Sequence, residues 1–143
     1  ERWKREWSSF DIRYVGDNRD ADDPQRHLVP AVQRLWFRAD GTLPGSRHLH
    51  NAAFAYISDL SLLGASLVPH GVVIGSPQVK PASLDHTIWF HRPIAADQWL
   101  LYDQTSPSAS GARGLSTARV FSEDGTLVAS VAQEGLIRRV DAD

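Results

Sequence analysis

The stretch that decides the fold is Asn51-Ala-Ala-Phe-Ala-Tyr-Ile-Ser-Asp-Leu-Ser-Leu-Leu-Gly-Ala-Ser66. Apolar or small residues recur through it at helical spacing, on overlapping faces, which predicts a helix that is apolar nearly all round. Such a helix belongs inside a protein rather than on its surface. Ser46 is a candidate N-cap for it, and Pro69-His70-Gly71 supplies an end signal.

Asp59 interrupts this apolar segment and is the only acidic or basic residue between His50 and His70. A buried carboxylate is costly unless hydrogen bonds or a charge partner satisfy it. We therefore predict that the helix presents Asp59 to a functional pocket. The alternative is that Asp59 lies with Ser58 and Ser66 on a narrow solvent-exposed stripe of the helix.

The composition excludes several classes of function. The chain has 143 residues, a formal net charge of -2 and no cysteine, which suits one domain without a nucleic-acid or anionic-membrane surface. It has no thiol nucleophile, disulfide framework or cysteine zinc site. No apolar run approaches the length of a membrane-spanning helix and no signal peptide is recognised, so we expect a cytoplasmic protein without membrane insertion. Because the sequence begins at Glu1, the chain is a candidate fragment.

Strand patterns flank the helix on both sides. The segments with alternating or β-rich composition are Phe10–Val15, Ala31–Arg38, Leu84–His91, Gln98–Thr105, Gly114–Phe121 and Thr126–Ile137. One buried helix followed by strands in series predicts an α+β domain whose curved antiparallel sheet wraps around the helix.

Connections between the strands carry weaker signals. Asp124-Gly125 predicts a hairpin, and the Ser- and Gly-rich segment Ser106–Gly114 predicts a bulge or a bend. Residues 1–9 and 17–27 are polar and lack periodicity, so we expect them to be flexible.

The common catalytic motifs are missing from the sequence, including the nucleophile elbow and the phosphate-binding glycine loop. His48 and His50 form a His-x-His pair, but no acidic residue accompanies them at metal-ligand spacing, so we predict no metal site. A triad of Ser83, His86 and Asp59 is disfavoured, because residues 83 and 86 would point to opposite faces of one regular strand.

Ser83 and Gln133 are better candidates for a site with Asp59. Ser83 precedes the aromatic strand, and Gln133 interrupts the apolar residues of the last strand. A carboxylate, a hydroxyl and an amide together could orient and partly deprotonate one water molecule for attack on a carbonyl. Taken alone, each residue is better explained as solvent-facing at a strand end.

The sequence resembles the acyl-CoA thioesterase II family. The segments that carry the resemblance are Ala55–Leu60, Ser83–Pro93, Trp99–Tyr102, Ser108–Gly114, Asp124–Ser130 and Gln133–Gly135. The block Asp85-His-x-x-Trp-Phe-His-Arg-Pro93 is the most specific of them. That family has a double hotdog fold, and the resemblance covers only its C-terminal half. It therefore implies a single hotdog domain over residues 1–143.

The resemblance implies hydrolysis of fatty acyl-CoA to free acid and coenzyme A, without a metal, a cofactor or a covalent intermediate. The family's water-activating aspartate and glutamine fall on Asp59 and Gln133. Its threonine position is occupied by Ser83, which keeps the hydroxyl but loses the methyl group that helps to fix the rotamer.

Substrate-binding candidates lie in the same family-like segments. Arg92 and Arg113 are candidates for the coenzyme phosphates, although ordinary solvated arginines are an equally good interpretation. Tyr56 and His86 are further candidates beside Asp59 and Ser83.

The missing half leaves the partner and the activity open. Acyl-CoA sites of hotdog proteins lie between two units, so the resemblance implies a homodimer or pairing with a second hotdog domain. One alternative function is a non-catalytic acyl-CoA-binding or assembly module. Another is a hydratase or dehydratase, which ranks low because His48 and His50 precede Asp59 rather than following it by one turn.

Overall fold

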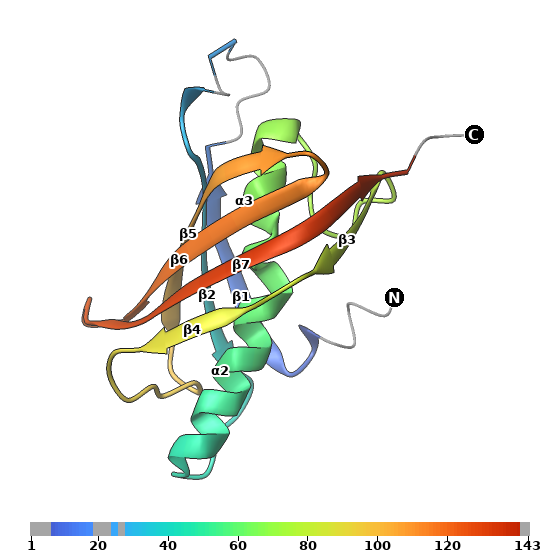
Figure 1. Cartoon of the computed structure of the whole chain (residues 1–143). Coiled ribbons are helices and arrows are strands. Elements are labelled where there is room, and N and C mark those ends of the chain that lie inside the picture. The colour runs from blue at the N-terminus through green and yellow to red at the C-terminus, as the bar shows by residue number, and fades with distance from the viewer. Residues whose placement is uncertain (1–6, 19–23, 26–27, 141–143) are drawn as a thin grey trace.

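The computed structural model describes residues 7–18, 24–25 and 28–140, in which a helix lies against the concave face of one sheet (Figure 1). The strands are β1 (Phe10–Asp17), β2 (Ala31–Ala39), β3 (Val79–Ser83), β4 (Thr87–Phe90), β5 (Leu100–Ser110), β6 (Arg113–Ser122) and β7 (Leu127–Arg139). The helical elements are α2 (Arg47–Leu62), α3 (Gly64–Leu67) and the 3-10 helix η2 (Val68–His70).

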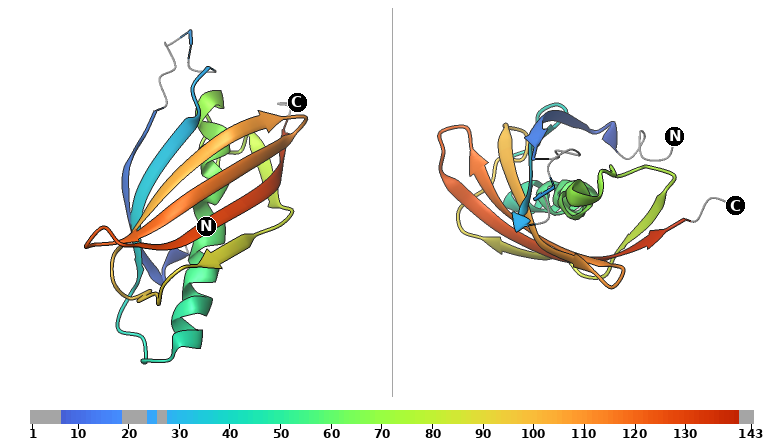
Figure 2. Two further views of the ribbon diagram at one scale, coloured as in Figure 1. Left: turned by 60° about the vertical axis from the view of Figure 1, so that its left-hand side comes forward. Right: turned by 90° about the horizontal axis from the view of Figure 1, so that it is seen from above.

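The sheet is antiparallel and strongly curved. Its strand order is β1-β2-β5-β6-β7-β3. The strand β4 pairs with an earlier part of β7, on the same edge of β7 as β3. Seen from above, the strands curl around the helix, while in side view the first turns of α2 extend past the end of the sheet (Figure 2). This arrangement confirms the predicted α+β hotdog architecture, a helix wrapped by a curved antiparallel sheet.

The central helix begins and ends close to the predicted positions. It starts at Arg47, directly after Ser46, which occupies the predicted N-cap position. The Ser46 side chain makes no capping hydrogen bond, and its backbone carbonyl accepts the N–H of His50 at 3.2 Å instead. Gly71 ends the helical stretch in the left-handed region, with φ 67°. Glycine suits this conformation because it has no Cβ to clash.

One expectation from the sequence is wrong. We predicted no segment with the length of a membrane-spanning helix, but the stretch Arg47–His70 is long and apolar enough on length and composition alone. Most of that stretch is buried inside the domain, as is usual for the core helix of a globular protein. Its apolar character is therefore explained by the sheet that surrounds it.

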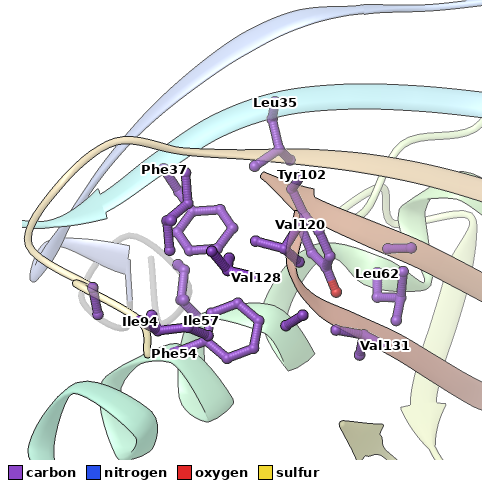
Figure 3. Close-up of a cluster of buried hydrophobic side chains, with 14 residues drawn as sticks. Leu35, Phe37, Phe54, Ile57, Leu62, Ile94, Tyr102, Val120, Val128 and Val131 are labelled. Atoms are coloured by element: carbon purple, nitrogen blue, oxygen red, sulfur yellow. The ribbon is translucent and has the colours of Figure 1, made fainter. Parts of the chain in front are cut away.

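The core lies between α2 and the sheet (Figure 3). Phe54 of α2 is fully buried and packs against Phe37 of β2, with ring centroids 6.1 Å apart. Phe37 also meets the edge of Tyr102 of β5, at 5.5 Å. Offset and edge-on contacts of this kind add to the stabilisation from area burial. They hold α2 against β2 and β5 along the half of the helix that precedes Asp59.

The helical segment packs closely on β6 and β7 at paired glycines. Gly114 and Gly135 are cross-strand partners. A Cβ added to Gly135 would lie 2.3 Å from Leu63 Cδ1, and one added to Gly114 would lie 2.4 Å from Ser66 Oγ. Neither methyl group fits unless the facing side chain, Leu63 or Ser66, shifts. The two glycines thus fix the position of the end of α2 over the sheet. Gly135 lies two residues along β7 from Gln133.

The structure also corrects several predicted boundaries. The sequence analysis missed β3, which contains Pro81 and lies at the edge of the sheet, where proline is tolerated. Most of Ser106–Gly114 is strand, although the predicted bulge is confirmed by a register shift between Thr105 and Ser108.

The expected flexible segments fall only partly on the described residues. Asp17 belongs to β1 and pairs with Gln33, so it is not part of a loop. Residues 1–6, 19–23 and 26–27 lie outside the described part of the chain.

Candidate active site

A bulge between β3 and β4 shapes the candidate site. The predicted strand Leu84–His91 is shorter than expected, because β4 covers only Thr87–Phe90. Ser83 of β3 pairs with Gly135 of β7, and Thr87 of β4 pairs with Ala132 of β7. The chain therefore advances four residues from β3 to β4 while β7 advances only three. One extra residue in an antiparallel edge is a β-bulge, and it re-aims the side chains around it.

Hydrogen bonds to Glu134 of β7 hold the bulge. The Glu134 carbonyl accepts the N–H of Leu84 at 2.9 Å, and the Glu134 N–H donates to the Asp85 carboxylate at 2.8 Å. Ser83 and His86 consequently line the same pocket. The argument that these two residues must point to opposite faces is therefore wrong, because it assumed one regular strand.

No Ser-His-Asp triad forms, however. Ser83 donates its hydroxyl proton directly to Asp59 at 3.0 Å. His86 uses Nε2 to contact the hydroxyl of Ser58 at 3.2 Å. A serine nucleophile would need its proton to be accepted by the histidine, so this arrangement does not activate Ser83 for attack.

Asp59 is the point where the predicted catalytic side chains meet. Its carboxylate is half-buried and lies between α2 and the sheet. Oδ1 accepts hydrogen bonds from the Ser83 hydroxyl and from Nε2 of Gln133. The described residues provide no hydrogen bond to Oδ2. The structure therefore brings Asp59, Ser83 and Gln133 together and leaves one carboxylate oxygen available.

The alternative interpretation, in which Asp59 belongs to a solvent-exposed stripe of the helix, does not hold. Ser58 and Ser66, the other members of that stripe, are both fully buried. Each donates its hydroxyl proton to a backbone carbonyl three residues earlier, Ser58 to Ala55 and Ser66 to Leu63. Gln133 is also fully buried rather than solvent-facing.

An open pocket of about 310 Å³ lies beside Asp59. It is lined by Ala55, Tyr56, Asp59, Ser83, Leu84, Asp85 and His86. Tyr56 stacks on Phe10 of β1 with ring centroids 5.9 Å apart, which holds one apolar wall in place. The lining contains carboxylates but no lysine or arginine, so its electrostatics suit a neutral group better than a phosphate.

Two titratable residues next to Asp59 are held neutral by burial. Burial lowers the pKa of His86, although the negative charges of Asp59 and Asp85 oppose this shift. Burial also raises the pKa of Tyr102 well above its ordinary value, and the charge of Asp59 raises it further. The Tyr102 hydroxyl donates to the carbonyl of Ser58 at 2.9 Å, which fixes the helix one residue before Asp59.

The two candidate phosphate-binding arginines lie outside the pocket. Arg92 follows β4 and donates from Nη1 to the carbonyl of Leu127 at 2.6 Å. Arg113 begins β6 and lies 3.7 Å from the carboxylate of Glu134. Since they flank different parts of β7, the structure does not bring them together, and a phosphate-binding role for either stays a prediction.

Histidines at the helix start have a structural explanation. Nδ1 of His50 accepts the backbone N–H of Ala96 at 3.0 Å, which ties α2 to the loop before β5. His48 is exposed. Among the described residues no group of three or more metal-ligating side chains comes together.

Sequence reasoning missed two residues that shape the site. Asp85 anchors the bulge, and Ser58 holds His86. Each is the chain neighbour of a predicted site residue, and Asp85 also opens the most specific of the family-like segments. Their contacts depend on the bulge, which only the pairing with β7 reveals.

Comparison with known proteins identifies the family to which this chain belongs. The model of the acyl-CoA thioesterase family matches residues 16–136. The chain belongs to the acyl-CoA thioesterase family. It is 40% identical over 110 residues to acyl-CoA thioesterase 2 of Haemophilus influenzae, covering 77% of this chain and 38% of that protein. It is 45% identical over 118 residues to acyl-coenzyme A thioesterase 8 of Mus musculus, covering 80% of this chain and 35% of that protein.

Solved structures agree with this assignment. An acyl-CoA thioesterase II from Mycobacterium marinum superposes with a TM-score of 0.80 at 43% identity, covering 96% of this chain and 52% of that chain. A putative thioesterase from Syntrophus aciditrophicus, at 10% identity and a TM-score of 0.69, shares the fold. This chain thus spans little more than a third of the curated relatives cited here, and about half of the M. marinum chain.

Proposed function

We propose that this domain hydrolyses fatty acyl-CoA thioesters to a free fatty acid and coenzyme A, with a water molecule held by Asp59, Ser83 and Gln133. The observation that carries the proposal is the convergence of the Ser83 hydroxyl and the Gln133 amide on one oxygen of Asp59, beside an open pocket. Family membership supports the reaction class, and the convergence supports the residues.

In the proposed reaction Oδ2 of Asp59 acts as the general base. It accepts a proton from water while the water oxygen forms a bond to the thioester carbonyl carbon. The tetrahedral intermediate then collapses, the carbon–sulfur bond breaks, and the thiolate leaves as coenzyme A after taking the proton back from Asp59. Ser83 and Gln133 hold Oδ1, so the carboxylate cannot rotate away from the water.

Ser83 marks a departure from the threonine of the family pattern. The hydroxyl still donates to Asp59 at 3.0 Å, so the interaction needed for positioning is present. Without a β-branch the side chain has more rotamer freedom. We expect the same chemistry with a less tightly held water.

A second hotdog unit is proposed as the partner, either another copy of this chain or a separate domain. The pocket is open on one side, and exposed apolar side chains form part of its lining, with Tyr56 49% and Leu84 56% exposed. Apolar surface of this kind next to a site is usually covered in the assembled protein. Cover from a second unit would also enclose the acyl chain.

The reaction is tested by mixing the purified chain with a fatty acyl-CoA and following free coenzyme A with a thiol reagent, while its oligomeric state is measured. Release of thiol at a rate proportional to protein supports hydrolysis. Binding of acyl-CoA by a paired species without any release would instead support the non-catalytic module.

A further inference from the structure

The two ring nitrogens of His86 lie in different surroundings, and only Nε2 has a hydrogen-bond partner among the described residues. Nε2 lies 3.2 Å from Oγ of Ser58. The single hydroxyl proton of Ser58 is donated to the carbonyl of Ala55 at 3.1 Å. This arrangement favours the tautomer with the imidazole proton on Nε2, because Ser58 Oγ can then accept from His86 while it donates to Ala55.

Nδ1 of His86 is then an unprotonated acceptor. The described residues offer it no hydrogen bond, and the His86 side chain lines the pocket. The two nitrogens of an imidazole point in nearly opposite directions, so Nδ1 is turned away from Ser58 and the helix. Burial lowers the pKa of this histidine, which keeps the acceptor unprotonated near pH 7.

The other polar side chains of the pocket lining are mostly acceptors or already engaged. Asp59 and Asp85 are carboxylates, and one oxygen of Asp85 takes the N–H of Glu134. The proton of Ser83 goes to Asp59. Apart from the phenol of Tyr56, the pocket lining thus lacks a free side-chain donor. A ligand that binds here has to bring its own donors.

We propose that His86 Nδ1 accepts a hydrogen bond from a secondary amide N–H on the thiol side of the substrate. This inference rests on the proposed thioesterase function. In coenzyme A such an amide lies two methylene groups from the sulfur, so a thioester held at Asp59 carries a neutral donor close to its reacting carbon. His86 is then a specificity residue that distinguishes coenzyme-type thioesters from simple alkyl thioesters.

The test compares two thioesters of the same acyl group. One is the N-acetylcysteamine thioester, and the other is its keto analogue, in which a methylene replaces the amide N–H. The wild-type chain should favour the amide substrate in kcat/KM by about tenfold, the usual effect of one neutral hydrogen bond. His86→Phe should remove the preference. His91→Phe is the matched control, because His91 is exposed, contacts Ser130 and does not line the pocket.

The outcomes separate this inference from the proposed function. Equal hydrolysis of both thioesters by the wild-type chain overturns the role of His86 while the thioesterase function stands. Hydrolysis of neither thioester, nor of acyl-CoA, overturns both.

A second measurement does not depend on a folded variant. Nitrogen-15 NMR of the wild-type chain should show the Nε2–H tautomer of His86, with an Nδ1 signal that shifts on adding pantetheine and stays unchanged with a keto analogue of the same arm. A proton on Nδ1 in the free protein contradicts the inference.

Discussion

Oδ1 of Asp59 accepts hydrogen bonds from both Ser83 and Gln133, whereas Oδ2 of the same carboxylate has no donor from the described residues. The donors come from different strands, β3 and β7, and the acceptor comes from the central helix. A single carboxylate is therefore held at one oxygen by the sheet and is available at the other. This asymmetry is what makes Asp59 suitable as a base rather than only as a structural link.

Gln133→Leu should reduce kcat by about 100-fold, because removing one positioned donor at a catalytic centre costs on that order. Steady-state kinetics on acyl-CoA measure this. Gln104→Leu is a matched control, since Gln104 is also a fully buried glutamine of the sheet but contacts Gln33 and Ser61 instead. It should lose about 1–3 kcal/mol of stability with little effect on kcat. Similar kcat values for the two variants would argue against a special role for Gln133.

Ser83→Ala should lower kcat, whereas Ser83→Thr should not. Alanine removes the donor to Oδ1 of Asp59, and we expect a loss of about 10–100-fold, because a hydrogen bond to a charged group contributes about 1.5–3 kcal/mol. Threonine keeps the hydroxyl and restricts its rotamer, so kcat should stay the same or rise. An alanine variant as active as wild type would show that the Ser83 hydroxyl is dispensable for holding the carboxylate.

Gly135→Ala should destabilise the domain by about 1–3 kcal/mol, because the new methyl group would overlap Leu63 at 2.3 Å. Chemical denaturation measures the change in free energy of unfolding. Gly45→Ala is the control, since a Cβ there meets nothing within 4 Å and the backbone needs no left-handed conformation. If both variants unfold at the same denaturant concentration, the close packing of α2 on β7 is not as described.

Stability should fall as the pH drops below 6.5, in part because of His86. The unfolded chain takes up a proton at its ordinary pKa of 6.5, while burial lowers the pKa of His86 in the folded chain. Between these two pKa values the unfolded state binds more protons, so the free energy of unfolding decreases with falling pH. His86→Gln should flatten this part of the pH profile, measured by denaturation at several pH values from neutral downward. An unchanged profile in the variant would contradict the proposed burial of the imidazole.

The sequence was sufficient to predict the central relationship of the fold. A helix apolar on nearly every face, followed by strands in series, has few ways to bury itself other than inside a curved sheet. The same reasoning singled out Asp59, because a lone carboxylate in such a helix needs partners. Its partners, Ser83 and Gln133, came from residue type and from the family resemblance.

What the sequence did not predict depends on register. The parity argument against Ser83 and His86 failed because one extra residue between β3 and β4 changes which side faces the helix. The extra residue can be recognised only from the pairing of both β3 and β4 with β7. The strand β3 was missed for a local reason, since Pro81 is a poor strand residue except at an edge.

Long-range placement of charged side chains was also beyond the sequence. Arg92 and Arg113 both lie in family-like segments, yet neither reaches the pocket of this domain. Arg92 follows β4 and Arg113 begins β6, so their placement outside the pocket depends on how these strands pair with β7, not on a local pattern. If either binds a phosphate, it does so outside the pocket beside Asp59.

The measurement that tests the central claim most directly is kcat of Asp59→Asn for acyl-CoA hydrolysis, in a preparation whose wild-type form is active. Asparagine has nearly the same shape but cannot accept the proton of the attacking water, so kcat should fall by about 10²–10⁴-fold while the far-ultraviolet circular dichroism stays that of the wild type. A folded Asp59→Asn variant that releases coenzyme A at the wild-type rate would contradict the role of this carboxylate as the base.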